Sequence, residues 1–135
     1  MYAFYSHRPT SYTICLSNLV RNKELEEKGS LKIILGKDIV GRDKIIDIAK
    51  MPHLLIAGQT GSGKSVAVNT LVASLISKRS FKEVKFIMVD PKMVELMPFN
   101  GIPHLLLPVI IDPKQASIAL KWAVAEMENR YRMLM

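Results

Sequence analysis

The sequence feature that most constrains this chain is the stretch GQTGSGKS, which satisfies the pattern G-x-x-x-x-G-K-[ST]. Glycines let the backbone fold back so that several N–H groups point at one anion, and a following helix adds partial positive charge. In this pattern Lys64 reaches the terminal phosphates of a nucleotide, and the Ser65 hydroxyl can hold Mg²⁺. The residues predicted to bind nucleotide are Gly58, Gln59, Thr60, Gly61, Ser62, Gly63, Lys64 and Ser65.

The segments around this loop predict an α/β core. The apolar run HLLIAG at residues 53–58 predicts a short buried strand, and a helical apolar period follows the loop. The run VKFIMVD at residues 84–90 predicts a second strand, parallel to the first through a right-handed crossover. LLLPVIID at residues 105–112 predicts a third extended segment, which Pro108 confines to an edge or irregular position.

A lead-in is expected before this core. Residues 1–17 show little pattern and form a poorly defined start. The polar stretch 18–28 predicts a short helix that ends at Gly29, a residue type that readily takes a left-handed conformation. The β-rich runs at 31–35 and 44–48 predict a hairpin with a longer loop. Residues 18–50 are therefore read as a helix and hairpin, and residues 51–135 as the core.

The end of the chain predicts a long helix. Asp112 can cap it, Pro113 suits its first position, and Gln115 completes the spacing of a capping box. An apolar stripe along this helix predicts a buried face. The stripe consists of Ala116, Leu120, Ala123, Met127, Tyr131 and Leu134.

Composition sets the broad class. With 49% hydrophobic and 23% charged residues, the chain has the composition of a soluble globular domain. No apolar run approaches the roughly 20 residues of a membrane span, and no secretory signal is evident. The lone Cys15 fits a reducing, cytoplasmic compartment. The net charge of +7 is spread thinly, so by itself it is weak evidence for a nucleic-acid partner.

Few other residues carry candidate chemistry. Asp90 closes an apolar strand and is either a metal-site aspartate or a structural residue at the strand end; its pattern alone favours the structural role. Asp112 is better used as a helix cap. His53 and His104 both follow proline, and without clustered Cys or carboxylate partners they indicate packing rather than a zinc site.

Several segments together resemble the motor domain of the FtsK/SpoIIIE family of bacterial DNA translocases. They are LGKDIVGRD, DIAKMPHLLIAGQTGSGKS, VKFIMVDPKMVEL, IPHLLLPVIIDP and ALKWAVAEMENRYRML, in this order. The resemblance implies a partial RecA-like P-loop NTPase core that binds ATP and Mg²⁺. It also implies a homo-hexameric ring that moves along double-stranded DNA during chromosome segregation at division or sporulation.

The resemblance also implies what lies elsewhere. The family's Walker B segment, an apolar strand ending in Asp-Glu, is expected downstream of the last helix, together with the DNA-contacting loops. Residues 51–135 are thus expected to be the N-terminal part of the motor, inactive alone, with any membrane anchor of the parent protein outside this chain. In this topology Asp90 lies one strand too far away to bind the metal. Two alternatives remain: a self-contained small P-loop kinase or NTPase, and a non-catalytic remnant that only binds nucleotide.

Overall fold

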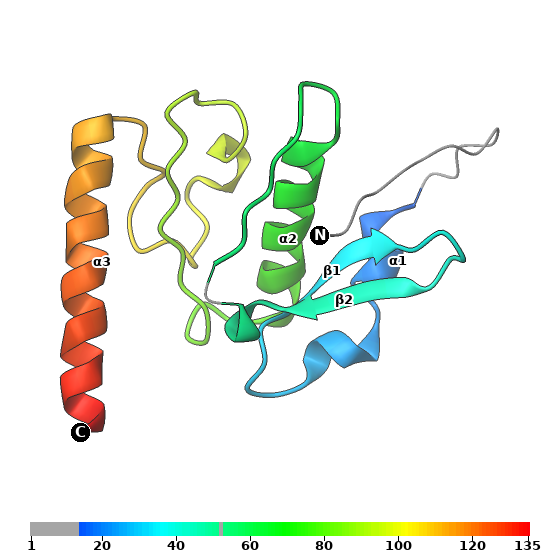
Figure 1. The fold of residues 1–135 in the computed structure, drawn as a ribbon, viewed down its shortest axis with the longest axis horizontal. Coiled ribbons are helices and arrows are strands. Elements are labelled where there is room, and N and C mark those ends of the chain that lie inside the picture. The colour runs from blue at the N-terminus through cyan, green and yellow to red at the C-terminus, as the bar shows by residue number, and fades with distance from the viewer. Residues whose placement is uncertain (1–13, 52) are drawn as a thin grey trace.

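The computed structural model describes residues 14–51 and 53–135, so the first 13 residues of the predicted lead-in lie outside the described part. In chain order its elements are α1 (Leu16–Leu19), the 3-10 helix η1 (Lys23–Glu26), β1 (Lys32–Lys37), β2 (Asp43–Asp47), the 3-10 helix η2 (Ile48–Lys50), α2 (Lys64–Lys78), the 3-10 helix η3 (Met97–Phe99) and α3 (Pro113–Leu134). Helix α2 stands between the hairpin and the loops of residues 84–110, and α3 forms the far edge (Figure 1).

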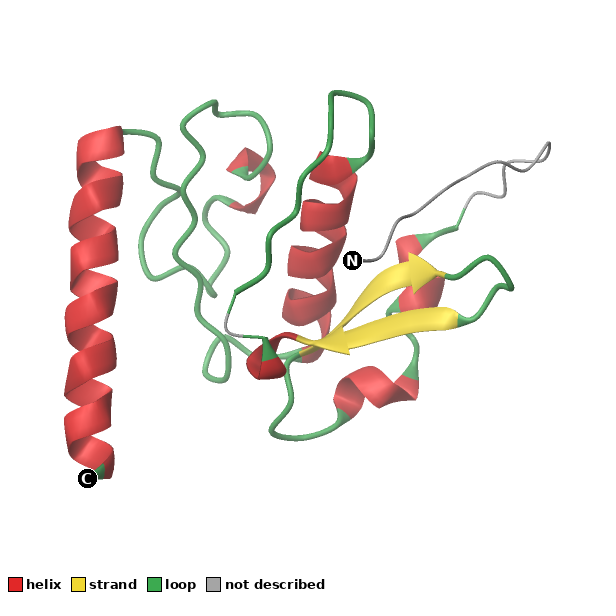
Figure 2. Cartoon of the chain, in the orientation of Figure 1, coloured by secondary structure: helices red, strands yellow, loops and turns green. Residues whose placement is uncertain are grey.

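The predicted hairpin is confirmed. Strands β1 and β2 pair antiparallel, with Lys32 opposite Asp47 and a bulge between Ile34 and Gly36. The Asp38 carboxylate closes the connecting loop by accepting the backbone N–H groups of residues 40 and 42. The hairpin forms the only sheet among the described residues (Figure 2). The parallel sheet that the sequence predicts for the core is not formed there.

The predicted helix over residues 18–28 is wrong. Helix α1 covers only its beginning, and the Asn22 side chain then accepts the N–H of Glu24 at 2.9 Å. This local bond starts a separate 3-10 turn, since an asparagine side chain offers the backbone an alternative to the helical bond. Gly29 does adopt the expected left-handed conformation, with φ at +76°.

The predicted buried strand at residues 53–58 does not form. Leu54 is 44% exposed and Leu55 is 90% exposed, and within the described residues this segment joins no strand ladder. A strand is stabilised by its neighbours, and here no described segment lies in register beside it. The segment still leads directly into the glycine-rich loop, as expected.

The segments at 84–90 and 105–112 run parallel to each other but pair at only two points. Two isolated parallel bridges join them, Phe86 with Leu105 and Val89 with Ile110. Pro108 lies between the two bridges and has no N–H to donate, so a continuous ladder is interrupted. The expectation of an irregular third segment is confirmed. The predicted parallel pairing of residues 53–58 with 84–90 is not formed among the described residues.

Packing between α2 and these two segments forms one hydrophobic core. Val72 of α2 contacts Met88 and Val109, all of them buried. A second, smaller core lies under the hairpin and contains Leu25 and Ile34, both fully buried. The glycine-rich loop is therefore followed by a helix that is firmly fixed to the body of the protein.

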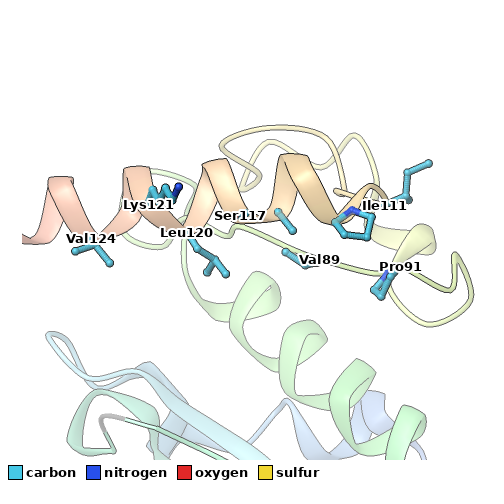
Figure 3. Close-up of a pocket in the computed structure, with 9 residues that line it drawn as sticks. Val89, Pro91, Ile111, Ser117, Leu120, Lys121 and Val124 are labelled. Atoms are coloured by element: carbon cyan, nitrogen blue, oxygen red, sulfur yellow. The ribbon is translucent and has the colours of Figure 1, made fainter.

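Helix α3 begins as predicted but packs differently. Asp112 accepts the N–H of Gln115 at 3.0 Å, and Pro113 is the first helical residue. The predicted apolar stripe is largely exposed, including Leu120 and Tyr131, whereas Ala119 is the buried residue of this helix. Figure 3 shows Leu120 and its neighbours along α3, which line an open groove with the segment from Val89 to Pro91. No helix in the described ranges combines the length and the apolar character needed to cross a bilayer.

Candidate nucleotide-binding site

The glycine-rich loop folds back on itself immediately before α2. Gly61 and Gly63 have φ of +83° and +88°, in the left-handed region where a Cβ would be strained. The N–H of Ser62 donates to the carbonyl oxygen of Gln59 at 3.0 Å and closes a turn. Glycines therefore stand where the backbone reverses, as the motif requires.

Gly58 is required for a different reason, namely space. A Cβ placed on Gly58 would collide with the Ser62 Oγ and would lie 3.2 Å from the Ser62 Cβ. The approach to the Oγ is far closer than any normal contact. The start of the loop can thus approach its tip closely only because residue 58 has no side chain.

The loop delivers two polar side chains to the first turn of α2. Lys64 and Ser65 are the first two residues of this helix, and both are half-buried. Gly63 provides no side-chain cap, and the first turn contains no acidic residue. The first N–H groups of a helix have no partner within it and carry partial positive charge. This end of α2 therefore favours an anion.

The side chains of Lys64 and Ser65 are both hydrogen-bonded to a carboxylate, that of Glu95. The Lys64 Nζ donates to both oxygens of Glu95, at 2.6 and 2.9 Å, and the Ser65 hydroxyl donates to Glu95 Oε1 at 2.9 Å. The hydrogen bonds from Lys64 and then Ser65 lower the pKa of the Glu95 carboxyl. The groups that the sequence assigns to phosphate and metal thus hold an anionic oxygen group of this same chain.

Asp90 positions the segment that presents Glu95. Its Oδ2 accepts the backbone N–H of Leu96 at 2.8 Å and of Glu95 at 2.9 Å, and the residue is buried. These bonds, with that from Leu96 foremost, lower the pKa of the Asp90 carboxyl. Asp90 is therefore a structural residue that holds a turn.

The turn between these acids has an unusual backbone. Met93 has φ of +57°, a left-handed value that costs a non-glycine residue energy, and its N–H donates to the Asp90 carbonyl at 3.1 Å. Such conformations persist where surrounding bonds enforce them, and the Asp90 carboxylate supplies two such bonds. The position of Glu95 is thus built into the local fold.

Glu95 is a site residue that the sequence motifs do not predict. Lys64 and Glu95 are 31 positions apart, and no periodicity relates the two. The sequence shows an acid five residues after Asp90 in DPKMVE, but the pairing depends on how the second core segment turns back toward α2. Only the three-dimensional arrangement brings these groups together.

The two histidines that the structure describes, His53 and His104, take no part in the site. His104 is buried, and its Nε2 lies 2.8 Å from the Arg79 carbonyl oxygen, which fits the packing role predicted for it. His53 is exposed. Neither is bonded to Lys64 or Ser65 in the described structure.

The donor set at the loop fits magnesium and nucleotide. The Ser65 hydroxyl and the Glu95 carboxylate are oxygen ligands, the kind that Mg²⁺ prefers, and they lie in contact. Lys64 supplies positive charge for phosphate oxygens. The residues present are therefore suited to a nucleotide with its magnesium ion.

A glycine-rich loop that places lysine and serine on the first helical turn defines the class of P-loop proteins. The chain belongs to the FtsK/SpoIIIE family, a P-loop NTPase family, whose model matches residues 16–135.

Proteins named DNA translocase FtsK resemble the chain closely. That of Rickettsia prowazekii is 55% identical over 121 residues, covering 89% of this chain and 16% of the relative. That of Haemophilus influenzae is 58% identical over 113 residues, covering 84% and 21%. That of Agrobacterium fabrum is 54% identical over 126 residues, covering 93% and 14%. The chain thus spans between 14% and 21% of the length of these relatives.

Proposed function

We propose that this chain is the ATP-binding portion of a double-stranded DNA translocase motor that acts in bacterial chromosome segregation at division or sporulation. The observation that carries the proposal is the pair Lys64 and Ser65 on the first turn of α2, both hydrogen-bonded to the Glu95 carboxylate. The names of the relatives, DNA translocase FtsK, support DNA as the partner of the complete motor.

The proposal includes the organisation of the motor. Residues 51–135 form the N-terminal part of a RecA-like core, and residues 18–50 form a lead-in that packs against α2. The complete motor is a homo-hexamer that works in the cytoplasm, and any membrane anchor belongs to other parts of the protein. ATP and Mg²⁺ bind through residues 58–65, with the Ser65 hydroxyl toward the metal.

A self-contained P-loop kinase is less well supported. Such an enzyme would use the strand-end acid Asp90 as a metal ligand. Asp90 Oδ2 accepts the N–H groups of Glu95 and Leu96, which belong to the turn that follows it. This supports a structural role for the carboxylate. A remnant that only binds nucleotide has the same loop, and turnover measurements distinguish it from a motor.

Nucleotide binding is tested by calorimetric titration of the 135-residue chain with Mg-ATP. We expect Lys64→Ala to weaken binding at least about tenfold, because the ammonium group contacts the terminal phosphates. Lys114→Ala is the matched control, since Lys114 is an exposed lysine in the first turn of α3. Equal affinity of wild type and Lys64→Ala would refute the assignment of the loop.

A further inference from the structure

Glu95 is the one acidic side chain in the described structure that is bonded to both functional side chains of the loop. Two of the three donors of the Lys64 ammonium are directed at its carboxylate, and the Ser65 hydroxyl donates to it as well. A nucleotide phosphate needs these same donors. The carboxylate therefore competes with phosphate for Lys64.

The backbone of Glu95 is fixed independently of this contact. Its N–H is bonded to the buried Asp90 carboxylate, and the Asp90 N–H donates to the Ile110 carbonyl at 2.8 Å, within the core. The next residue, Leu96, packs against the core that includes Val72. When Lys64 turns to a phosphate, Glu95 thus remains next to the Ser65 hydroxyl.

We propose that Glu95 is a further residue of the nucleotide site, which shields Lys64 in the free protein and serves as an additional acidic group toward Mg²⁺ when nucleotide is bound. The inference rests on the proposed function, since it concerns the same site. A carboxylate beside the serine hydroxyl supplies a hard oxygen ligand, either directly or through a metal-bound water. It also balances the positive charge of Lys64 in the free protein.

The two roles act in opposite directions on affinity, which makes them separable. Loss of the competing carboxylate strengthens nucleotide binding without Mg²⁺. Exposed or half-exposed ion pairs such as that of Lys64 with Glu95 contribute little free energy. We therefore expect nucleotide affinity without Mg²⁺ to rise only about two- to fivefold. Loss of an acid beside a metal weakens metal binding about tenfold or more. The enhancement of nucleotide affinity by Mg²⁺ should therefore fall about tenfold.

The test is titration of wild type and Glu95→Gln with ATP, with Mg²⁺ and with EDTA, after circular dichroism has shown equal folding. Glu128→Gln is the matched control, because it removes the same charge from an exposed position on α3. The expected result is tighter binding in EDTA and a smaller Mg²⁺ enhancement in Glu95→Gln alone.

Each other outcome has a definite meaning. If Glu95→Gln gains affinity equally with and without Mg²⁺, Glu95 is only a competitor and the proposal is overturned. Unchanged affinities under both conditions overturn it as well. If wild type and Lys64→Ala fail alike to bind ATP, the proposed function itself fails and the inference falls with it. If Lys64→Ala loses binding while Glu95→Gln behaves as wild type, only the inference fails.

Discussion

The Arg79 Nε donates a hydrogen bond to the carbonyl oxygen of Ser30 at 3.1 Å, although 49 positions separate the two residues. Its Nη2 donates to the carbonyl oxygens of Leu25 and Glu27 as well, at 3.1 and 2.5 Å. Arg79 follows the last residue of α2 and is only 8% exposed. The helix that begins at the nucleotide loop is thus tied at its other end to the lead-in.

Replacing Arg79 should destabilise the protein strongly. Arg79→Ala leaves buried carbonyl oxygens without donors, and bonds from a charged donor contribute about 1.5–3 kcal/mol each. We expect a loss of about 3 kcal/mol in the free energy of unfolding, measured with urea. Arg130→Ala is the control, because Arg130 makes an exposed pair with Glu126 worth about 0.5 kcal/mol. Similar losses in both variants would contradict the assigned role of Arg79.

Gly58→Ala should weaken nucleotide binding by distorting the loop. The added Cβ meets the Ser62 Oγ, so the loop has to open at the place where the motif is predicted to bind phosphate. We expect about a tenfold loss of Mg-ATP affinity in a calorimetric titration. Adding Ser62→Ala should restore part of the loss, because it removes the nearer of the two contacting atoms.

A glycine elsewhere provides the control for Gly58. Gly101 has φ of +90°, and a Cβ added there would meet open space, so Gly101→Ala costs about 1 kcal/mol of stability through backbone strain. The nucleotide affinity of Gly101→Ala should equal that of wild type. If Gly58→Ala also binds normally, the close approach of Gly58 and Ser62 has no role in the site.

The elements predicted correctly from sequence are those specified by local signals. The start of α3 follows from Asp112 and Pro113, and the hairpin follows from two β-rich runs around a polar loop. The helix predicted over residues 18–28 does not form in full, because the Asn22 side chain accepts a backbone N–H and starts a new turn. The local sequence pattern is thus sufficient to predict an element where no side chain offers the backbone an alternative hydrogen bond.

The features missed from sequence depend on distant segments. The apolar run at 53–58 has strand composition, but it has no described neighbour with which to form a ladder. The loop residues themselves were predicted from the motif, because its glycines specify the turn. Glu95 was not, since its contact with Lys64 arises from the turn that Asp90 and Met93 impose.

Asp90→Asn should reduce stability in a pH-dependent way. The pKa of Asp90 is lower in the folded than in the unfolded protein, because backbone N–H groups bond to its carboxylate. Its stabilisation is therefore complete above the ordinary aspartate pKa of about 3.9 and is lost as pH falls through the lower folded-state value. We expect a loss of about 1–2 kcal/mol at pH 7 and a smaller difference from wild type at pH 3, measured with urea.

The same variant separates a structural from a metal-binding role. Asparagine retains an oxygen that accepts both N–H groups, so the Mg²⁺ dependence of nucleotide binding should change little in Asp90→Asn. Asp112→Asn is the control for charge, since asparagine caps a helix as well as aspartate does. A large loss of Mg²⁺ dependence with an intact circular dichroism spectrum would favour the small-kinase alternative.

The 135-residue chain should not turn over ATP at a rate that duplex DNA increases. Within the described residues Asp90 is engaged by its own turn, and Glu95 is the acid bonded to Lys64. From the resemblance we expect the Asp-Glu segment and the DNA-contacting loops of the motor to lie downstream of α3. Hydrolysis needs an acid that orients the attacking water, and translocation needs those loops.

Phosphate release with and without duplex DNA measures this directly, for the 135-residue chain and for a longer version that spans the motor of the FtsK relatives. Stimulation by DNA only in the longer version, abolished there by Lys64→Ala, is the expected result. Basic side chains can still give weak, salt-sensitive DNA binding through phosphates, so binding alone does not indicate motor function. DNA-stimulated turnover by residues 1–135, abolished by Lys64→Ala, would mean that these residues already contain every catalytic group.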